Sequence, residues 1–94
     1  MTVWQVDLSK KVVRQIGRLP DRTAKEDLFA LLRDIELHGP VRGDWPNYGK
    51  LGENRHHCHI KRGHPTYVAV WEDSPKGRKE VEVIYVGTHE RAPY

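Results

Sequence analysis

The sequence predicts an α+β fold of the order β-α-α-β-β-β, in which an antiparallel helix hairpin packs on one face of a mainly antiparallel sheet. Two observations support this fold class. Two segments with a helical spacing of apolar residues lie early in the chain, and three strand-like segments lie late. The chain has 94 residues, 37% of them hydrophobic, which suffices for one small core, so we expect a single domain over residues 1–94.

The first predicted element is a strand. Over residues 2–9 polar and apolar residues alternate, as they do in a strand with one buried face. Its apolar face consists of Trp4, Val6 and Leu8. Ser9 ends this pattern and suits the N-cap of a helix that follows directly.

Two amphipathic helices come next. The first covers residues 10–19 and is stopped by Pro20. Its apolar stripe consists of Val12, Val13, Ile16 and Leu19. The second begins after Asp21, where Thr23 and Glu26 fit a capping box, and ends at a Gly-Pro pair. The short connection predicts that the two helices pack as an antiparallel hairpin.

A loop rich in glycine and proline, with at most a short strand near residues 48–51, leads into three strands over residues 55–61, 66–72 and 80–86. Side chains alternate along the first of these strands. The side that carries His56, Cys58 and Ile60 should face the helices. The opposite side carries Arg55, His57, His59 and Lys61. We expect that second face of the sheet to be free for function.

Composition and charge limit the classes of function. The net charge is +3, and residues 41–64 hold five cations against two acids. A positive region of this kind favours an anionic partner, above all a nucleic acid. The single cysteine excludes an intramolecular disulfide, and no segment resembles a secretion signal or a membrane span. We therefore expect a cytoplasmic protein with no membrane partner.

The segment NRHHCHIKRGHPTY, residues 54–67, holds four of the six histidines and allows three interpretations. His57 and His59 could bind zinc, but no further ligands follow at a suitable spacing, so we expect no metal and no cofactor. The segment could also be an ordinary polar strand face. The third interpretation is acid/base cleavage of RNA. A neutral imidazole takes the proton of a ribose 2′-hydroxyl and a charged imidazole donates to the leaving oxygen.

The C-terminal segment VGTHERAPY favours the third interpretation. It places His89 just beyond the last strand and adds Arg91 and Tyr94, and unstacked bases rest on aromatic rings and arginine planes. We expect His89 to meet His59 at one edge of the sheet. The cations that could bind RNA phosphates are Lys50, Lys61, Arg62 and Arg91.

The chain resembles the RelE/ParE superfamily of bacterial type II toxins, and within it the RelE-like ribosome-dependent mRNA endonucleases, above all the YafQ-like enzymes. The motifs that carry this resemblance are SKKVVRQIGRLP, PVRGDW, CHI and GTH. The resemblance implies a toxin that cuts mRNA on the ribosome and is silenced by a cognate antitoxin. It also implies a catalytic role for His59 and His89, with Tyr94 as a stacking ring. The candidate catalytic residues are therefore His59, His89, His57, Arg55 and Tyr94.

The chain departs from the YafQ-like pattern at three positions. Gly39, Thr66 and Tyr85 stand where those chains have a histidine, an acid and an arginine. The charge of the transition state would then have to be met by Arg55, Lys61, Arg62 or Arg91. The alternative is a ParE-like toxin that inhibits DNA gyrase without chemistry. Such a binding protein has no evident use for two converging histidines, which favours the nuclease.

Overall fold

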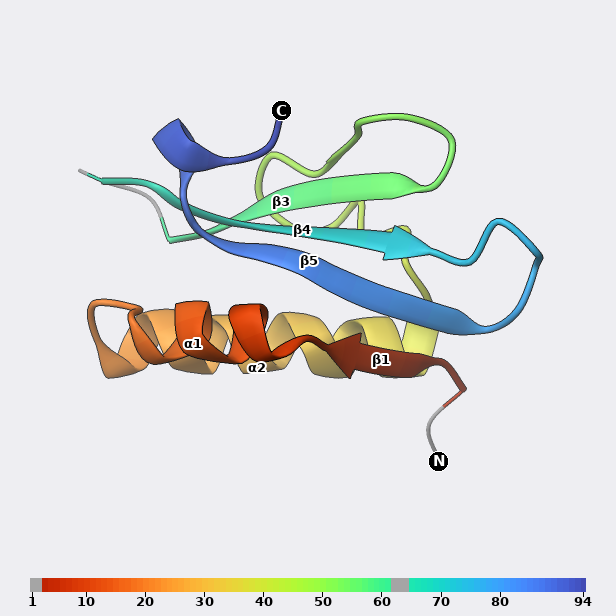
Figure 1. Cartoon of the computed structure of the whole chain (residues 1–94), viewed down its shortest axis with the longest axis horizontal. Coiled ribbons are helices and arrows are strands. Elements are labelled where there is room, and N and C mark those ends of the chain that lie inside the picture. Colours follow the sequence, from red (N-terminus) through yellow and green to blue (C-terminus); the bar gives the residue numbers. More distant parts are fainter. Residues whose placement is uncertain (1–2, 62–64) are drawn as a thin grey trace.

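The structure is a computed structural model that describes residues 3–61 and 65–94. Its elements are β1 (Gln5–Leu8), α1 (Lys10–Gly17), α2 (Arg22–His38), β2 (Gly49–Lys50), β3 (Arg55–Lys61), β4 (Tyr67–Asp73), β5 (Glu80–Thr88) and the 3₁₀ turn η1 (His89–Arg91). The strands form one sheet in the order β1-β5-β4-β3-β2. Both helices lie on one side of this sheet and the C-terminal segment on the other (Figure 1). The predicted α+β class is confirmed, and β2 is the short strand expected before β3.

The sheet is mixed, because β1 pairs parallel with β5 while the other neighbouring strands pair antiparallel. The parallel pairing ends where Leu8 lies opposite Val83, so no strand of the described chain lies beside the second half of β5 at this edge. There the side chain of Gln15 on α1 accepts a hydrogen bond from the backbone N–H of Val86 at 3.0 Å. A sheet-edge donor is thus satisfied by a helix side chain rather than by a strand.

The helix starts differ in how well the sequence predicted them. Ser9 caps α1 as expected, since its hydroxyl accepts a hydrogen bond from the N–H of Val12 at 3.1 Å. The capping box of Thr23 and Glu26 is wrong, because Asp21 caps α2 by accepting from the N–H of Ala24 at 2.8 Å. Aspartate is among the best N-cap residues, so the helix begins at the first position that offers one. Across the described chain, neither helix has the length and apolar character needed to cross a bilayer.

The core lies between the helices and the inner face of the sheet. His56, Cys58 and Ile60 face the helices as predicted, each with 4% or less of its surface exposed. Trp71 is fully buried and donates its indole N–H to the carbonyl of Pro40 at 2.9 Å. The predicted stripe of α1 is wrong in one member, because Val13 is 54% exposed.

The outer face of the sheet was expected to be free, but it is partly covered. Val68 and Val70 of β4 point away from the helical core, yet both are completely buried. The C-terminal segment crosses this face of the sheet (Figure 1). A backbone hydrogen bond of 2.8 Å from His89 N to Thr66 O ties the beginning of η1 to the start of β4. The segment that follows β5 is therefore folded back over the strands.

Candidate functional site

Four aromatic side chains meet on the outer face of the sheet, and we call them the histidine cluster: His57, His59, His89 and Tyr94. The rings of His59 and His89 lie edge to face, with their centroids 5.7 Å apart. The ring of Tyr94 is 5.7 Å from that of His89 and 4.8 Å from that of His57. The structure thus brings together four of the five residues that the sequence suggested as catalytic.

The alternation of β3 places two members of the histidine cluster. His57 and His59 are two residues apart and therefore point to the same face of the strand. Their cross-strand partners are Val70 and Val68, whose fully buried side chains lie on the same face. The imidazoles consequently pack beside apolar side chains. Water is partly excluded there, and interactions between charges are stronger than in solution.

The end of β5 places the third member. The hydroxyl of Tyr85 donates to the carbonyl of Thr88 at 2.7 Å, across the turn from which His89 leaves the strand. Gly87 makes this contact feasible, because a Cβ at that position would lie 2.6 Å from the Tyr85 hydroxyl oxygen. Tyr85 therefore fixes the turn before His89.

The surroundings of His57 disfavour its charged form. Burial lowers its pKa from the ordinary value of 6.5, and electrostatic repulsion by His59 and His89 lowers it further. Its Nδ1 atom is buried and has no hydrogen-bond partner among the described residues. On the other side of the ring, a Cβ at Gly49 of β2 would lie 2.9 Å from Nε2. The glycine therefore makes room for the ring beside the edge strand.

Tyr94 contributes a ring surface rather than an ionisable group. Burial raises the pKa of its phenol, and the neighbouring Cys58 and Tyr85 raise it further, so the hydroxyl stays protonated at neutral pH. The side chain is 48% exposed while it touches two imidazoles. A ring of this kind, anchored on one side and open on the other, can stack on an unpaired base.

The predicted cations are placed less favourably for an anion. The guanidinium of Arg55 contacts Glu72 at 2.9 Å and 2.8 Å, so its charge is compensated. Lys50 is paired with His56, and directly opposed residues share a face, so it lies on the opposite side from the histidine cluster. Lys61 ends β3, and Arg62 lies outside the described residues. Arg91 ends η1 and is exposed, two residues after His89.

Cys58 is a core residue, as the alternation of β3 indicated. It is fully buried, and burial, reinforced by the charge of Asp44, raises the pKa of its thiol to about 12. A thiol of this kind stays protonated and is a poor nucleophile and metal ligand. Over residues 3–61 and 65–94, no three histidine, cysteine, aspartate or glutamate side chains are arranged to hold a metal ion.

A second histidine site, on the inner face, was not predicted. Nδ1 of His56 is 2.7 Å from the hydroxyl of Tyr48, and its Nε2 is 2.7 Å from a carboxylate oxygen of Asp73. Its ring also stacks on Trp71, at a centroid distance of 5.8 Å and an angle of 9°. Burial alone would raise the pKa of Asp73, but hydrogen bonds from His56 and Asn54 outweigh it and lower that pKa. A histidine that faces the core needs hydrogen-bond partners there. The predicted inward orientation of His56 was therefore the sequence signal that could have indicated this second site.

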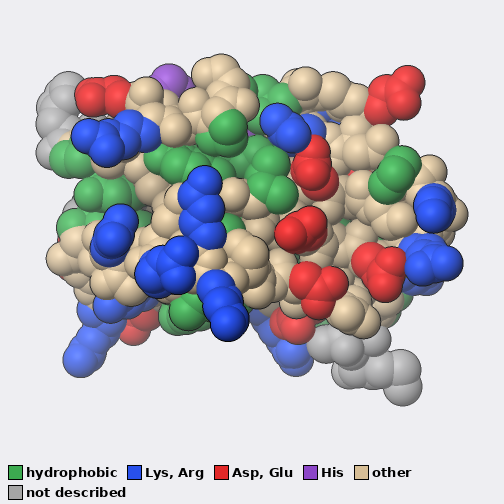
Figure 2. Space-filling model, in the orientation of Figure 1, with side chains coloured by type: hydrophobic (Ala, Val, Ile, Leu, Met, Phe, Trp, Pro, Cys, Tyr) green, Lys and Arg blue, Asp and Glu red, His purple; other side chains and the backbone are tan. Residues whose placement is uncertain are grey.

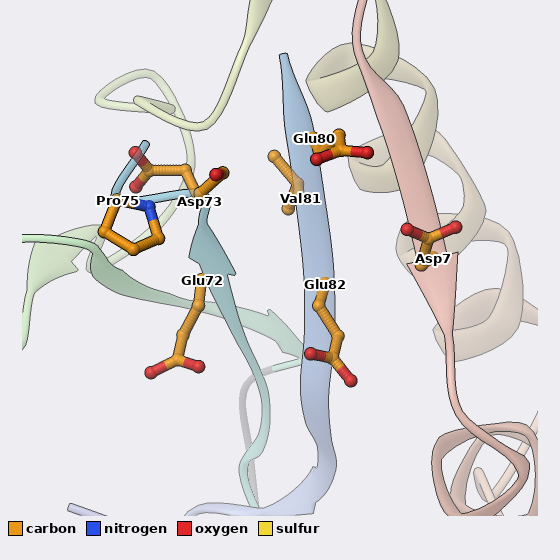
Figure 3. Close-up of a pocket in the computed structure, with 8 residues that line it drawn as sticks. Asp7, Glu72, Asp73, Pro75, Glu80, Val81 and Glu82 are labelled. Carbon is orange, nitrogen blue, oxygen red and sulfur yellow. The ribbon is translucent and has the colours of Figure 1, made fainter. Parts of the chain in front are cut away.

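The other end of β4 and β5 is acidic. A hollow of about 270 Å³ lies there, and the carboxylates that line it belong to Asp7, Glu72, Asp73, Glu80 and Glu82. Figure 3 shows three of them, Asp7, Glu72 and Glu82, coming from three adjacent strands. Figure 2 shows acidic side chains over this half of the surface and basic side chains over α1. An anionic ligand would be repelled from the acidic end and drawn toward the basic one.

The fold resembles a known structure. It superposes on a chain from the crystal structure of the archaeal RelE–RelB complex from Pyrococcus horikoshii OT3, with a TM-score of 0.61. The match covers 98% of this chain and 100% of that chain, at 15% sequence identity. No protein-family model and no curated protein sequence matches the chain. Similarity at this level of identity establishes the RelE-like fold.

Proposed function

We propose that the chain is a single-domain toxin of a type II toxin–antitoxin system, and that it acts as a YafQ-like endoribonuclease on mRNA bound to the ribosome. The observation that carries this proposal is the convergence of His59 and His89, whose ring centroids are 5.7 Å apart on the outer face of the sheet. The RelE-like fold supports it independently.

The proposed reaction needs two proton transfers and no metal. One imidazole removes the proton of a ribose 2′-hydroxyl, whose oxygen attacks the adjacent phosphorus. The second imidazole, in its charged form, gives a proton to the 5′-oxygen as its bond to phosphorus breaks. The products are a 2′,3′-cyclic phosphate and a free 5′-hydroxyl. DNA would not be cut by this route, because it lacks the 2′-hydroxyl.

The electrostatics of the histidine cluster suit such a pair. Three imidazoles cannot all be charged at this spacing without repulsion, and His57 responds with a lowered pKa. Repulsion of this kind disfavours protonation of all the imidazoles at once, and acid/base catalysis near neutral pH requires one neutral and one charged imidazole. Tyr94 would stack on a base beside the scissile bond and hold the nucleotide out of the mRNA stack.

The proposed partners follow from the same assignment. An mRNA and the ribosome supply the substrate in the cytoplasm, and a cognate antitoxin silences the enzyme. The similar structure is itself a complex of two proteins, which supports an antitoxin as the partner of this chain.

A cleavage assay tests the proposal. Protein, ribosomes and mRNA are incubated and the cut sites are mapped by primer extension. We expect His59→Ala and His89→Ala each to slow cleavage by roughly a hundredfold or more, the usual scale for loss of a general acid or base. The matched control is His38→Ala, an exposed histidine at the end of α2 that should leave cleavage unchanged. Full cleavage by both cluster variants would overturn the assignment.

The same preparations distinguish the gyrase alternative. A ParE-like toxin would inhibit DNA supercoiling by gyrase and would leave mRNA intact. In cells, the proposed nuclease stops protein synthesis first, whereas a gyrase inhibitor first induces signals of DNA damage. Inhibition of supercoiling that persists in the His59→Ala and His89→Ala variants would favour the alternative.

A further inference from the structure

A second hollow lies at the histidine end of the sheet, and nothing in the proposed reaction uses it. It forms beside the second half of β5, where the part of the chain that the structure describes places no strand and α1 approaches instead, through the hydrogen bond between Gln15 and Val86. We call it the arginine pocket. The side chains that define its chemistry are Gln15, Arg18, Tyr67, Tyr85, Thr88 and Arg91.

The arginine pocket is positively charged. Arg18 follows directly on α1 and Arg91 ends η1, and none of the described residues that line the pocket is acidic. Neither guanidinium forms an ion pair with any residue that the structure describes. A guanidinium presents several N–H donors in a planar fork, and this arrangement matches the oxygens of a phosphate group.

Neutral donors complete the lining of the pocket. The side-chain oxygen of Gln15 accepts from the backbone of Val86, which leaves its amide N–H₂ group as a donor of fixed orientation. Tyr67 and Thr88, which both carry a hydroxyl group, also line the pocket. The volume is about 270 Å³, just below the usual range for small-molecule sites, roughly 300 to 1,000 Å³. This size fits a phosphate group or one nucleotide rather than a larger metabolite.

The arginine pocket and the histidine cluster share a single turn of the chain. His89 begins η1 and belongs to the cluster, while Arg91 ends η1 and lines the pocket. A strand whose scissile phosphate lies between the imidazoles therefore passes within reach of the pocket. We propose that the arginine pocket binds a second phosphate of the same RNA strand, with Arg18 and Arg91 as its ligands. This inference rests on the proposed function, since it takes RNA as the ligand.

Salt-dependent binding tests the proposal. The probe is a single-stranded RNA with 2′-O-methyl groups, which lacks the attacking hydroxyl and cannot be cut. We expect the Arg18→Gln/Arg91→Gln double variant to bind it roughly tenfold more weakly, as expected for loss of charge-assisted hydrogen bonds. The slope of log affinity against log salt should become shallower by about 0.7, the value for one phosphate contact on a single strand.

The matched control is Lys10→Gln/Arg14→Gln, which removes the same charge from exposed positions of α1 outside the pocket. It should keep the wild-type slope. If the two double variants lose affinity and slope equally, α1 acts only through general positive charge and the proposal is overturned. Both pocket arginines are exposed, so their replacement should leave the fold intact, as thermal unfolding can verify.

Inorganic phosphate distinguishes an RNA site from a site for free phosphate. Its binding would shift the amide NMR signals of Val86 and Thr88 in the wild type and not in the double variant. Such shifts, combined with an unchanged RNA slope, would overturn the proposal. If the double variant shows the predicted change in slope but the wild type never cuts RNA, the proposed nuclease activity is rejected and the phosphate site in the arginine pocket is supported. If the wild type cuts RNA but the double variant shows no change in slope, the nuclease activity is supported and the phosphate site is rejected.

Discussion

Two adjacent histidines on β3 have opposite surroundings. His56 faces the helices, is 1% exposed, and has both ring nitrogens in contact with partners at 2.7 Å. His57 faces outward, with one nitrogen buried and unpartnered among the described residues. The difference follows from the alternation of a strand, which sends neighbouring side chains to opposite faces. A histidine that is fully hydrogen-bonded stabilises the fold, whereas a buried ring nitrogen without a partner costs free energy.

The comparison also extends to the carboxylates. On the inner face, a carboxylate oxygen of Asp73 lies 2.7 Å from Nε2 of His56 and holds the ring in place. On the outer face, the guanidinium of Arg55 pairs with Glu72, and the imidazoles contact one another and Tyr94. The carboxylates of the two faces thus have different partners, an imidazole on the inner face and a guanidinium on the outer one. Four predictions test this division, in order of decreasing effect.

The largest effect should come from His56→Ala. Removing this ring leaves a cavity beside Trp71 and deprives Tyr48 and Asp73 of their partner. We expect the free energy of unfolding to fall by about 3 kcal/mol, as for other large buried truncations that also break hydrogen bonds. Denaturant titration measures this change. His57→Ala serves as the control and should cost less than about 1 kcal/mol. If both variants lost the same free energy of unfolding, the inner and outer histidines would not differ in their contribution to stability.

Tyr94→Ala should affect activity alone. We expect cleavage to slow by roughly tenfold, because stacking of one base on an aromatic ring contributes on the order of 1 to 3 kcal/mol. Tyr94→Phe, which keeps the ring, should cleave at nearly the wild-type rate. The side chain is 48% exposed, so thermal unfolding should be unchanged in both variants. A Tyr94→Ala variant with wild-type cleavage would exclude the stacking role.

Stability should fall in two steps as the pH is lowered, one for each face. The folded-state pKa of His57 lies below its ordinary value of 6.5, so the unfolded chain binds the proton more readily. The contribution of His57 to the free energy of unfolding is therefore fully present above about pH 6.5. It declines as the pH falls toward the folded-state pKa of His57. The pKa of Asp73 is also lowered, from 3.8, and its contribution is lost below that value.

Denaturant titration between pH 3 and pH 8 measures both steps. His57→Gln should flatten the step near neutral pH and leave the acidic one in place. Asp73→Asn should flatten the acidic step instead. If either substitution flattened both steps, the two faces would be coupled rather than independent.

The smallest effect should come from Gly49→Ala. The added methyl group would lie 2.9 Å from Nε2 of His57, so the ring has to move by a few tenths of an ångström. We expect cleavage to fall by a few-fold and unfolding to change by less than about 1 kcal/mol. Gly52→Ala is the control, since a Cβ there would meet nothing within 4 Å. Equal effects of the two substitutions would mean that the position of the His57 ring does not matter.

Much of the fold was accessible from the sequence because local patterns determine it. The period of β3 placed each of its described side chains on the correct face, and Ser9 marked the start of α1. The burial of Cys58 followed from the same reasoning. These features depend on residues close together in the chain, and such features can be recognised without knowledge of the register.

The parts that could not be predicted depend on pairings between distant segments. The ion pair of Arg55 with Glu72 exists only in the observed register of β3 and β4. The position of Lys50 opposite His56 likewise exists only in the observed register of β2 and β3. The coverage of Val68 and Val70 depends on a polar terminal segment that carries little hydrophobic signal. The convergence of His59 with His89 was expected from the sequence, and their catalytic role stays a prediction.

The parallel pairing of β1 with β5 has a consequence for how the chain matures. β1 is synthesised long before β5, its neighbour in the sheet, so this edge of β1 stays unpaired until β5 has left the ribosomal tunnel. His89 and Tyr94 follow β5 and emerge later still. The two histidines of β3 therefore meet the other members of the histidine cluster only after β5 and η1 have been synthesised.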